Sequence, residues 1–201
     1  MPFRSFYRNE LHENERELTM SITLSINGKL VEVPSESTVL DAINATGIYI
    51  PQLCKDPDMK PIGACRTCLI QVEGVRGFPT SCSLPAKEGM KISTDSEQLM
   101  SMRRGVIELT LAMSPGAHKT NAQARLSPNS ELTLAAKNHS IKYSRWDGRK
   151  REGTDTSNPV FNISMDACIL CGRCTQACQD GHQFIGAIDF LGTAKKSRIG
   201  T

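Results

Sequence analysis

Four cysteines near the end of the chain constrain its fold more than any other feature. They are Cys168, Cys171, Cys174 and Cys178, spaced as C-x2-C-x2-C-x3-C. This spacing is typical of a [4Fe-4S] site, because two-residue gaps let three sulfurs from one tight turn reach adjacent corners of a cubic cluster. In two-cluster proteins the fourth cysteine ligates the other cluster and precedes a proline, whereas Gln179 follows here. The run predicts a [4Fe-4S] cluster and raises the question of where another cluster lies.

The other four cysteines form a second group with a different spacing. Cys54, Cys65, Cys68 and Cys82 follow C-x10-C-x2-C-x13-C, and Gly63 comes two residues before the close pair. A close pair is typical of plant-type [2Fe-2S] sites, although their first gap is four residues rather than ten. A zinc site is the alternative, but structural zinc sites usually use two close pairs. The spacing therefore predicts a [2Fe-2S] cluster in this loop.

Composition indicates a small protein with a modest apolar core and cysteines that bind metal. With 201 residues and 39% apolar composition, the chain has room for one or two small domains with a modest core. Eight cysteines without a signal peptide favour metal ligation in the cytoplasm over a disulfide framework. No apolar run approaches the roughly 18 residues of a membrane span, so we expect no direct membrane insertion.

The first cysteine group lies within a segment whose pattern is that of a β-grasp fold. Alternating apolar residues flank Asn27-Gly28, which is a strong signal for a two-residue hairpin turn. Capping residues then precede a short amphipathic helix. The expected elements are a hairpin over 22–33, a helix over 39–47, and strands over 69–73 and 90–93.

The remaining chain alternates between apolar and polar stretches. Apolar spacing predicts a helix from Asp95 to Met113 and another from Glu131 to Asn138. A polar stretch and a short strand candidate, Val160 to Ile163, lead into the second cysteine group. We therefore expect an α+β protein with an N-terminal extension (1–19), a β-grasp [2Fe-2S] ferredoxin domain (20–94), a small helical domain (95–140), a linker (141–159) and the start of a bacterial ferredoxin-like [4Fe-4S] domain (160–201).

These features together resemble the N-terminal iron–sulfur region of NAD-dependent molybdenum formate dehydrogenase α subunits. The resemblance rests on the hairpin, Pro51-Gln-Leu-Cys54, Gly63-Ala-Cys-Arg-Thr-Cys68 with Cys82, and the later cysteine run. The large cluster-bearing subunit of respiratory complex I, the [FeFe]-hydrogenases and the diaphorase small subunit of NAD-reducing hydrogenases share this region. The stretch 183–201 is most similar to the formate dehydrogenases. The resemblance covers about residues 21 to 201, which is only the opening portion of such an α subunit.

The resemblance implies ligand sets for both clusters. Cys54 would pair with Cys65 on one iron, and Cys68 with Cys82 on the other. Cys168, Cys171 and Cys174 would bind one [4Fe-4S] cluster, which a second cysteine run completes in the formate dehydrogenases while Cys178 serves the other cluster. This chain ends before that run. Either Cys178 closes a single cluster, or a separately encoded chain supplies the rest, or the sequence is a truncated reading frame.

One departure from this family concerns a cluster between the two groups. The family usually holds another [4Fe-4S] cluster there through H-x3-C-x2-C-x5-C, but Ala117, Asn121, Ala124 and Ser130 stand at the ligand positions. His118 lies one residue from the vacant histidine position. We expect it to be a surface residue, like His139 and His12, and the domain to be a scaffold without its cofactor.

The expected function is electron transfer without a catalytic site. The chain has no Rossmann glycine fingerprint, P-loop or nucleophile elbow, so nicotinamide and flavin would bind to a partner. We expect an electron-transfer subunit or fragment between a flavin and NAD(H) partner and a catalytic partner, with a formate dehydrogenase as the expected complex. A complex I-like or NAD-reducing hydrogenase complex is the alternative.

Two interpretations of other classes remain open at this stage. The first is an iron–sulfur redox sensor, for which the basic stretch Arg145 to Arg151 would matter; the second is a nonfunctional fragment. A formal charge of +3 is too mild to predict nucleic-acid binding, so we expect that stretch to be a solvated loop or a protein-docking edge.

Overall fold

The computed structural model describes residues 20–113, 131–148, 153–160, 162–165, 167–181, 184–193 and 196–200. The predicted N-terminal extension over 1–19 lies outside these ranges. So do the residues at the vacant ligand positions, Ala117, Asn121, Ala124 and Ser130, together with His118 and His12.

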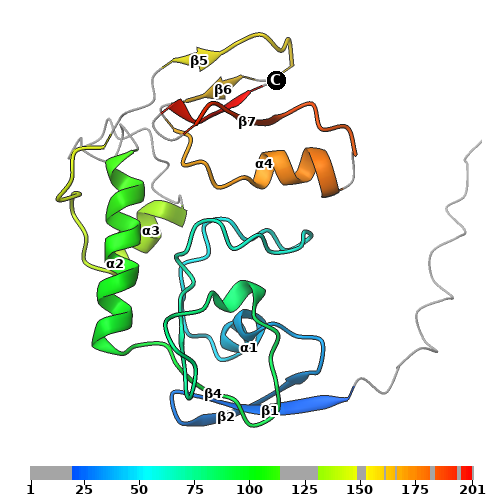
Figure 1. Ribbon diagram of the computed structural model, residues 1–201, viewed down its shortest axis with the longest axis vertical. Helices are drawn as coiled ribbons and strands as arrows, with labels where there is room; N and C mark the ends of the chain where they lie inside the picture. The colour runs from blue at the N-terminus through cyan, green and yellow to red at the C-terminus, as the bar shows by residue number, and fades with distance from the viewer. Residues whose placement is uncertain are drawn as a thin grey trace, which may run out of the picture.

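A four-stranded mixed sheet forms one end of the molecule (Figure 1). Its strands are β1 (Ser21–Ile26), β2 (Lys29–Pro34), β3 (Gln71–Val72) and β4 (Lys91–Ser93), in the order β2-β1-β4-β3. β1 runs antiparallel to β2 and parallel to β4, and β3 runs antiparallel to β4. The hairpin is confirmed: Asn27 and Gly28 have φ angles of 50° and 81°, as a two-residue hairpin turn requires.

Helix α1 (Val39–Ala45) covers the sheet and begins at a capping box. The Thr38 side chain accepts a hydrogen bond from the Asp41 backbone N–H, and the Asp41 carboxylate accepts one from the Thr38 backbone N–H at 2.9 Å. The buried face of the helix packs into the first apolar core, which includes Leu24 and Ile26 of β1. This local chemistry explains why the helix forms where the sequence predicts it.

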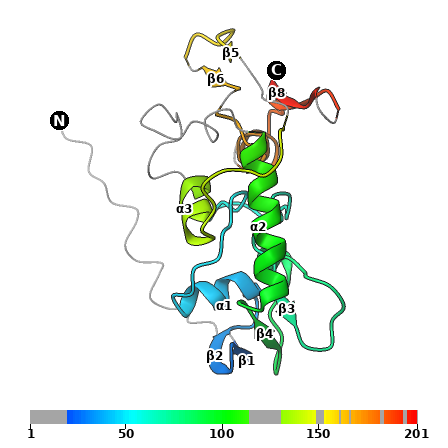
Figure 2. The same cartoon turned by 90° about the vertical axis from the view of Figure 1, so that its left-hand side faces the viewer.

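Two helices run between the sheet and the opposite end of the molecule. α2 (Glu97–Ala112) lies along one side, with α3 (Glu131–Asn138) against it (Figure 2). Both helices fall where apolar spacing predicts them. They bury a second apolar core, made of Leu53, Ile107, Leu111, Leu132, Ala135, Ala136 and Ile141. Cys65 and Ile169 pack against this core, so it contacts both cysteine groups.

The end opposite the sheet consists of short elements. Two two-stranded sheets pair β5 (Thr154–Asp155) with β6 (Ile163–Ser164), and β7 (Asp189–Leu191) with β8 (Arg198–Gly200). α4 (Arg173–Gln176) continues into a π-helical turn, Ala177–Gly181. Among the described residues, no helix combines the length and the apolar composition that crossing a membrane requires.

Several strands differ from the sequence-based prediction. β3 covers only the middle of the stretch 69–73, because Leu69 forms an isolated bridge with Thr80 instead. β6 begins at Ile163 rather than including Val160, which is 88% exposed. β5 lies within the predicted linker, where it provides the partner of β6. Elements of two residues depend on this pairing rather than on local sequence preference.

The basic stretch is attached to α2 through Arg145. Its Nε donates at 2.6 Å to Glu108, which is 1% exposed and also accepts from Arg104 at 3.4 Å. The Arg145 guanidinium lies 4.8 Å from the centre of the Trp146 ring. Beside it, a Cβ on Gly148 would come within 2.3 Å of the Ala112 carbonyl oxygen, so only glycine fits. Arg145 therefore fixes this loop to the helix, while Arg151 lies outside the described residues.

His139 is buried, so the prediction that it is a surface residue is wrong. Its side chain is only 8% exposed, and Nδ1 donates to the Ala135 carbonyl at 2.9 Å. In the described part of the chain, Nε2 has no hydrogen-bond partner. Burial lowers the pKa of His139, and the charges of Arg103 and Arg104 lower it further. The sequence around it, Asn138-His139-Ser140, is polar and gives no sign of this burial.

This burial predicts that acid destabilises the fold. Because the folded-state pKa of His139 lies below its ordinary value of 6.5, the unfolded chain takes up the proton first as the pH falls. The free energy of unfolding should therefore decrease below about pH 6.5, with no contribution from His139 above it. Urea unfolding of the apoprotein, from about pH 7.5 to about pH 5.5, should show a shallower pH dependence for His139→Phe. An unchanged slope in the variant would contradict the prediction.

Candidate iron–sulfur sites

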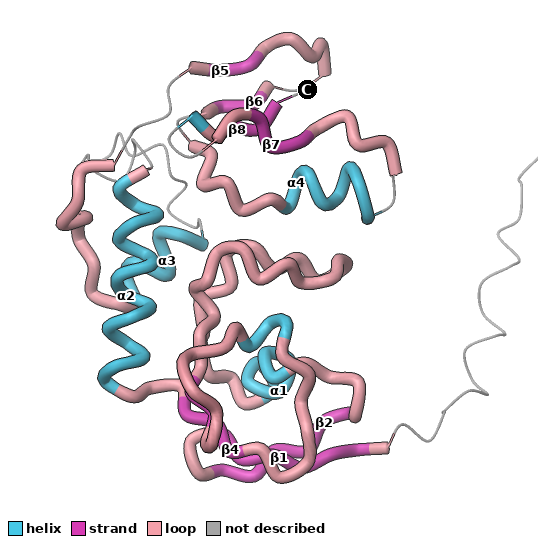
Figure 3. The backbone as a smooth tube through the Cα atoms, in the orientation of Figure 1, coloured by secondary structure: helices cyan, strands magenta, loops and turns pink. Residues whose placement is uncertain are grey.

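The first cysteine group lies in loops between the sheet and α4. Cys54 follows α1, Cys65 and Cys68 lie in the loop that leads to β3, and Cys82 sits in a 3-10 turn, Ser81–Ser83. Figure 3 shows how much of this region is loop rather than regular structure. Cys54, Cys68 and Cys82 are 2%, 1% and 1% exposed, and Cys65 is half-buried. The fold thus brings together four residues that span almost thirty positions of sequence.

These four cysteines meet as two pairs. The side chains of Cys54 and Cys65 hydrogen-bond to each other, and so do those of Cys68 and Cys82. The bond from Cys54 lowers the pKa of Cys65 to about 5, and the bond from Cys82 lowers the pKa of Cys68 to about 7. The same bonds raise the pKa of Cys54 and of Cys82, because a donating thiol resists deprotonation.

This arrangement suits two metal ions better than one. Two sulfur pairs can hold one iron each, as a [2Fe-2S] cluster requires, and the backbone N–H of Cys65 already points at the Cys54 sulfur at 3.4 Å. The donor set and its pairing therefore fit a [2Fe-2S] cluster.

Buried hydroxyls hold the loop around the cysteines, and one residue of this loop has a strained backbone. Thr67 is fully buried; its Oγ1 donates to the Pro51 carbonyl at 3.2 Å and lies 3.1 Å from the Cys65 sulfur. The hydroxyl and the backbone N–H of Ser81 both donate to the Cys68 carbonyl, at 2.8 and 2.9 Å. Arg66, between the close pair, has a φ of 55°, a left-handed conformation that costs a non-glycine residue about 1–2 kcal/mol. Sequence reasoning did not single out Thr67 or Ser81.

The second cysteine group surrounds the start of α4. Cys168 and Cys171 lie in the preceding loop, Cys174 lies in α4, and Cys178 lies in the π-helical turn. The Cys168 sulfur accepts a hydrogen bond from the Leu170 N–H at 3.4 Å. Leu170 has a φ of 55°, like Arg66 in the first group. A left-handed residue inside the C-x2-C spacing is thus common to both groups.

Three members of this group lie within electrostatic reach of one another. Cys174 is exposed, yet partial desolvation raises its pKa, and the charges of the neighbouring Cys171 and Cys168 raise it further. Clustered thiolates of this kind need a cation among them, which an iron–sulfur cluster provides. The Cys178 sulfur accepts a hydrogen bond from the Ala187 N–H at 3.2 Å. Cys178 lies one helical turn beyond Cys174.

The segments that carry the two cysteine groups are in contact. Gln176 of α4, which is 6% exposed, donates from Nε2 to the carbonyl of Lys60, in the loop between Cys54 and Cys65. Figures 1 and 3 show this loop lying alongside α4. At Gly172, a Cβ would lie 3.1 Å from Ile62 and 3.2 Å from Phe190, so these side chains cover the start of the helix.

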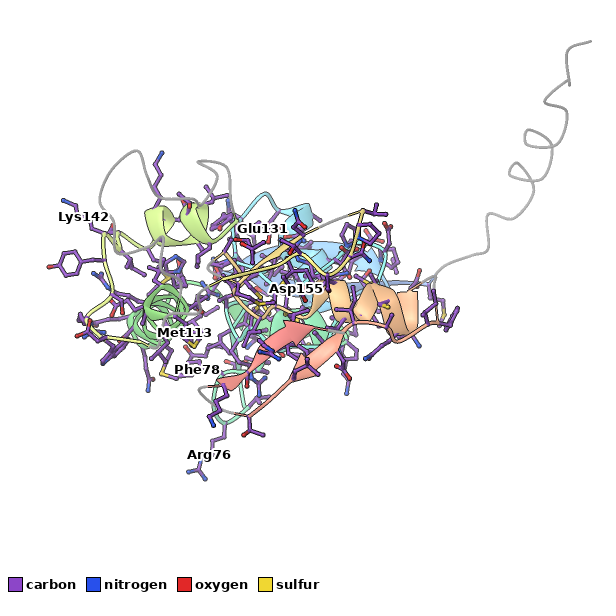
Figure 4. The ribbon with its side chains drawn as sticks, turned by 90° about the horizontal axis from the view of Figure 1, so that it is seen from above. Arg76, Phe78, Met113, Glu131, Lys142 and Asp155 are labelled. Carbon is purple, nitrogen blue, oxygen red and sulfur yellow. The ribbon has the colours of Figure 1, made fainter. Side chains whose placement is uncertain are left out.

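An ion pair fastens α4 to α3. Arg173 Nη1 and Nη2 contact the Glu131 carboxylate at 3.2 and 2.6 Å. Figure 4 shows Glu131 toward the middle of the molecule in the view from above, whereas Arg76 and Lys142 extend from its edges. The second cysteine group is thus held against both the first group and the helices.

Comparison with known proteins gives the same picture for the first group. Residues 19–97 match the family model of the 2Fe-2S iron-sulfur cluster binding domain. The chain is 33% identical over 82% of its length to the NADPH-Fe(3+) oxidoreductase subunit alpha of Geobacter sulfurreducens. It is also 33% identical, over 77% of its length, to an NADH-quinone oxidoreductase subunit of Streptomyces coelicolor. It spans only 19% and 18% of these two relatives.

A solved structure matches most of the chain. The crystal structure of NAD+-reducing [NiFe]-hydrogenase in the H2-reduced state superimposes with a TM-score of 0.75 and 30% identity, over 90% of this chain and 74% of that one. The likeness therefore extends well beyond the residues that match the family model. Residues 19–97 of the chain are a 2Fe-2S iron-sulfur cluster binding domain, and the chain is related to NADH-quinone oxidoreductase. It belongs to the same family as the matched chain of the NAD+-reducing [NiFe]-hydrogenase.

Proposed function

We propose that this chain relays single electrons through two adjacent iron–sulfur clusters, from or to a flavin and NAD(H) partner. The observation that carries the proposal is the contact between the two cysteine groups through Gln176 and Lys60. A cluster changes its oxidation state by one electron with little movement, so a direct contact between two cluster loops suits electron transfer. The protein would supply position and insulation rather than substrate chemistry.

The proposed ligands follow from the pairing of the sulfurs. Cys54 and Cys65 would hold one iron of the [2Fe-2S] cluster, and Cys68 and Cys82 the other. Supporting this assignment, each pair already includes one cysteine whose pKa is lowered toward the thiolate that binds metal. For the second site we propose a [4Fe-4S] cluster on Cys168, Cys171, Cys174 and Cys178.

The proposed partners are a nicotinamide- and flavin-binding subunit and a catalytic oxidoreductase. The relatives are named for NADPH-Fe(3+) oxidoreduction, NADH-quinone oxidoreduction and NAD+-reducing hydrogenase activity. These names support a nicotinamide-linked complex. They support a hydrogenase or a quinone oxidoreductase about as well as the sequence motifs support a formate dehydrogenase. The relay itself is the same in each complex.

Anaerobic purification with iron and sulfide analysis tests the cluster content. About six irons per chain would support both clusters, whereas about two would leave only the [2Fe-2S] site. EPR spectra of the dithionite-reduced protein would then assign the signals to the two cluster types.

The link to nicotinamide is tested with NADH. Reduction of the clusters by NADH only after addition of a flavoprotein NADH dehydrogenase would support the relay. Binding of nucleic acid that changes with the oxidation state of the clusters, without such reduction, would instead support a redox sensor.

A further inference from the structure

Arg103 is a buried arginine beside the first cysteine group, and neither motif nor spacing pointed to it. It lies in the middle of α2 and is 2% exposed. We propose that Arg103 is a positioning residue that fixes the backbone after Cys68 and raises the reduction potential of the [2Fe-2S] cluster. The inference rests on the proposed ligand role of Cys68, but not on the identity of any partner.

The guanidinium of Arg103 joins three segments of the chain. Nε donates to the Leu69 carbonyl at 2.9 Å, and Nη2 donates to the same oxygen. Nη1 donates to the Thr94 carbonyl at 2.8 Å, directly after β4. Because Leu69 follows Cys68 in the chain, the hydrogen bonds from the Arg103 guanidinium fix the backbone that carries this cysteine. A lysine ammonium cannot make these directed contacts in the same fixed geometry.

The partners of Arg103 leave its charge largely uncompensated. Among the described residues they are two backbone carbonyls and, at 3.8 Å, the sulfur of Met100, rather than a carboxylate in direct contact. Burial lowers the pKa of Arg103 to about 10, while the charges of Cys68 and Asp95 act in the opposite direction. The side chain therefore remains a cation at neutral pH, in a region where charges are poorly screened by water.

A cation in this position favours the reduced cluster. Reduction adds one electron to a cluster that is already negative with four thiolates, so attraction to the Arg103 guanidinium is stronger in the reduced state. The buried setting strengthens this attraction relative to a pair at the surface. The adjacent Arg104 offers a matched contrast, because its side chain is 50% exposed and pairs with Glu108 on α2.

The test compares Arg103→Met, Arg103→Lys and Arg104→Met by EPR-monitored redox titration of the purified protein. Loss of the charge in Arg103→Met should disfavour the reduced [2Fe-2S] cluster about tenfold, which lowers the midpoint potential by about 59 mV for a one-electron couple. Arg103→Lys should keep most of the potential, and Arg104→Met should keep nearly all of it. Thermal unfolding of the three apoproteins measures the positioning role separately, and both Arg103 variants should melt below the unsubstituted protein.

Three outcomes would overturn this inference. They are a shift in Arg103→Met no larger than in Arg104→Met, a shift in Arg103→Lys as large as in Arg103→Met, and apoprotein melting unchanged in both Arg103 variants. If Arg103→Met does not retain a cluster, Arg103→Gln, which keeps N–H donors but removes the charge, takes its place in both comparisons of potential. Absence of any [2Fe-2S] signal from the unsubstituted chain would instead overturn the proposed ligands.

Discussion

Replacing Cys65 with serine is expected to abolish the [2Fe-2S] cluster. Within its pair, the interaction with the Cys54 side chain lowers the pKa of Cys65, which favours the thiolate form that binds metal. Its backbone N–H also donates to the Cys54 sulfur at 3.4 Å. A serine hydroxyl, which deprotonates far less readily, would leave one iron with a single sulfur ligand from the protein. We expect the visible absorption and the EPR signal of the [2Fe-2S] cluster to disappear.

The control for this variant is Thr67→Val. Its hydroxyl lies 3.1 Å from the Cys65 sulfur and donates to the Pro51 carbonyl, but it is no proposed ligand. Thr67→Val should therefore retain iron with a changed EPR line shape and lower thermal stability. If Cys65→Ser kept its iron and its [2Fe-2S] signal while Thr67→Val lost them, Cys65 would not be a ligand.

The elements that sequence predicts well are those whose cause lies within a few residues. The hairpin depends on Asn27 and Gly28, which adopt positive φ angles at the turn. The first helix depends on the reciprocal hydrogen bonds of Thr38 and Asp41. α2 and α3 show their apolar spacing directly. Both cysteine groups are also recognisable by their spacing, because cluster ligation imposes a local pattern.

Features that depend on distant segments could not be predicted in this way. The parallel pairing of β1 with β4 joins residues more than sixty positions apart. The burial of Arg103 requires carbonyls from two other segments, and the sequence places it in an apparently ordinary basic pair with Arg104. The wrong prediction for His139 has a similar cause. Its sequence neighbours are polar and do not indicate that it is buried near Ala135 in the core.

The contact between the cysteine groups is the main structural addition to the sequence-based prediction. Gln176 sits between two cysteines of the second group, where sequence alone assigns it no role. Its side chain reaches a loop 116 positions earlier, at Lys60. Two separate cluster motifs thus become neighbours, which is the relation that a relay requires and that spacing within either motif cannot show.

Replacing Cys171 with serine should remove the second cluster and leave the first intact. Cys171 lies between Cys168 and Cys174, and its charge raises the pKa of Cys174. Loss of this thiolate should therefore disrupt the [4Fe-4S] site. We expect the iron content to fall from about six to about two per chain, with the [2Fe-2S] EPR signal retained. Electrons from the flavoprotein partner should then reduce the [2Fe-2S] cluster but reach no acceptor beyond the second site.

Cys178→Ser is the matched variant, because its sulfur accepts the Ala187 N–H at 3.2 Å and lies in the turn that follows α4. If Cys178 closes the cluster, its serine variant should lose the same four irons, about as completely as Cys171→Ser. If another thiolate closes the cluster, Cys178→Ser should keep the [4Fe-4S] signal while Cys171→Ser loses it. Iron content that stays unchanged in Cys171→Ser would remove the second cluster from the relay. The two variants together therefore separate the existence of the cluster from the identity of its fourth ligand.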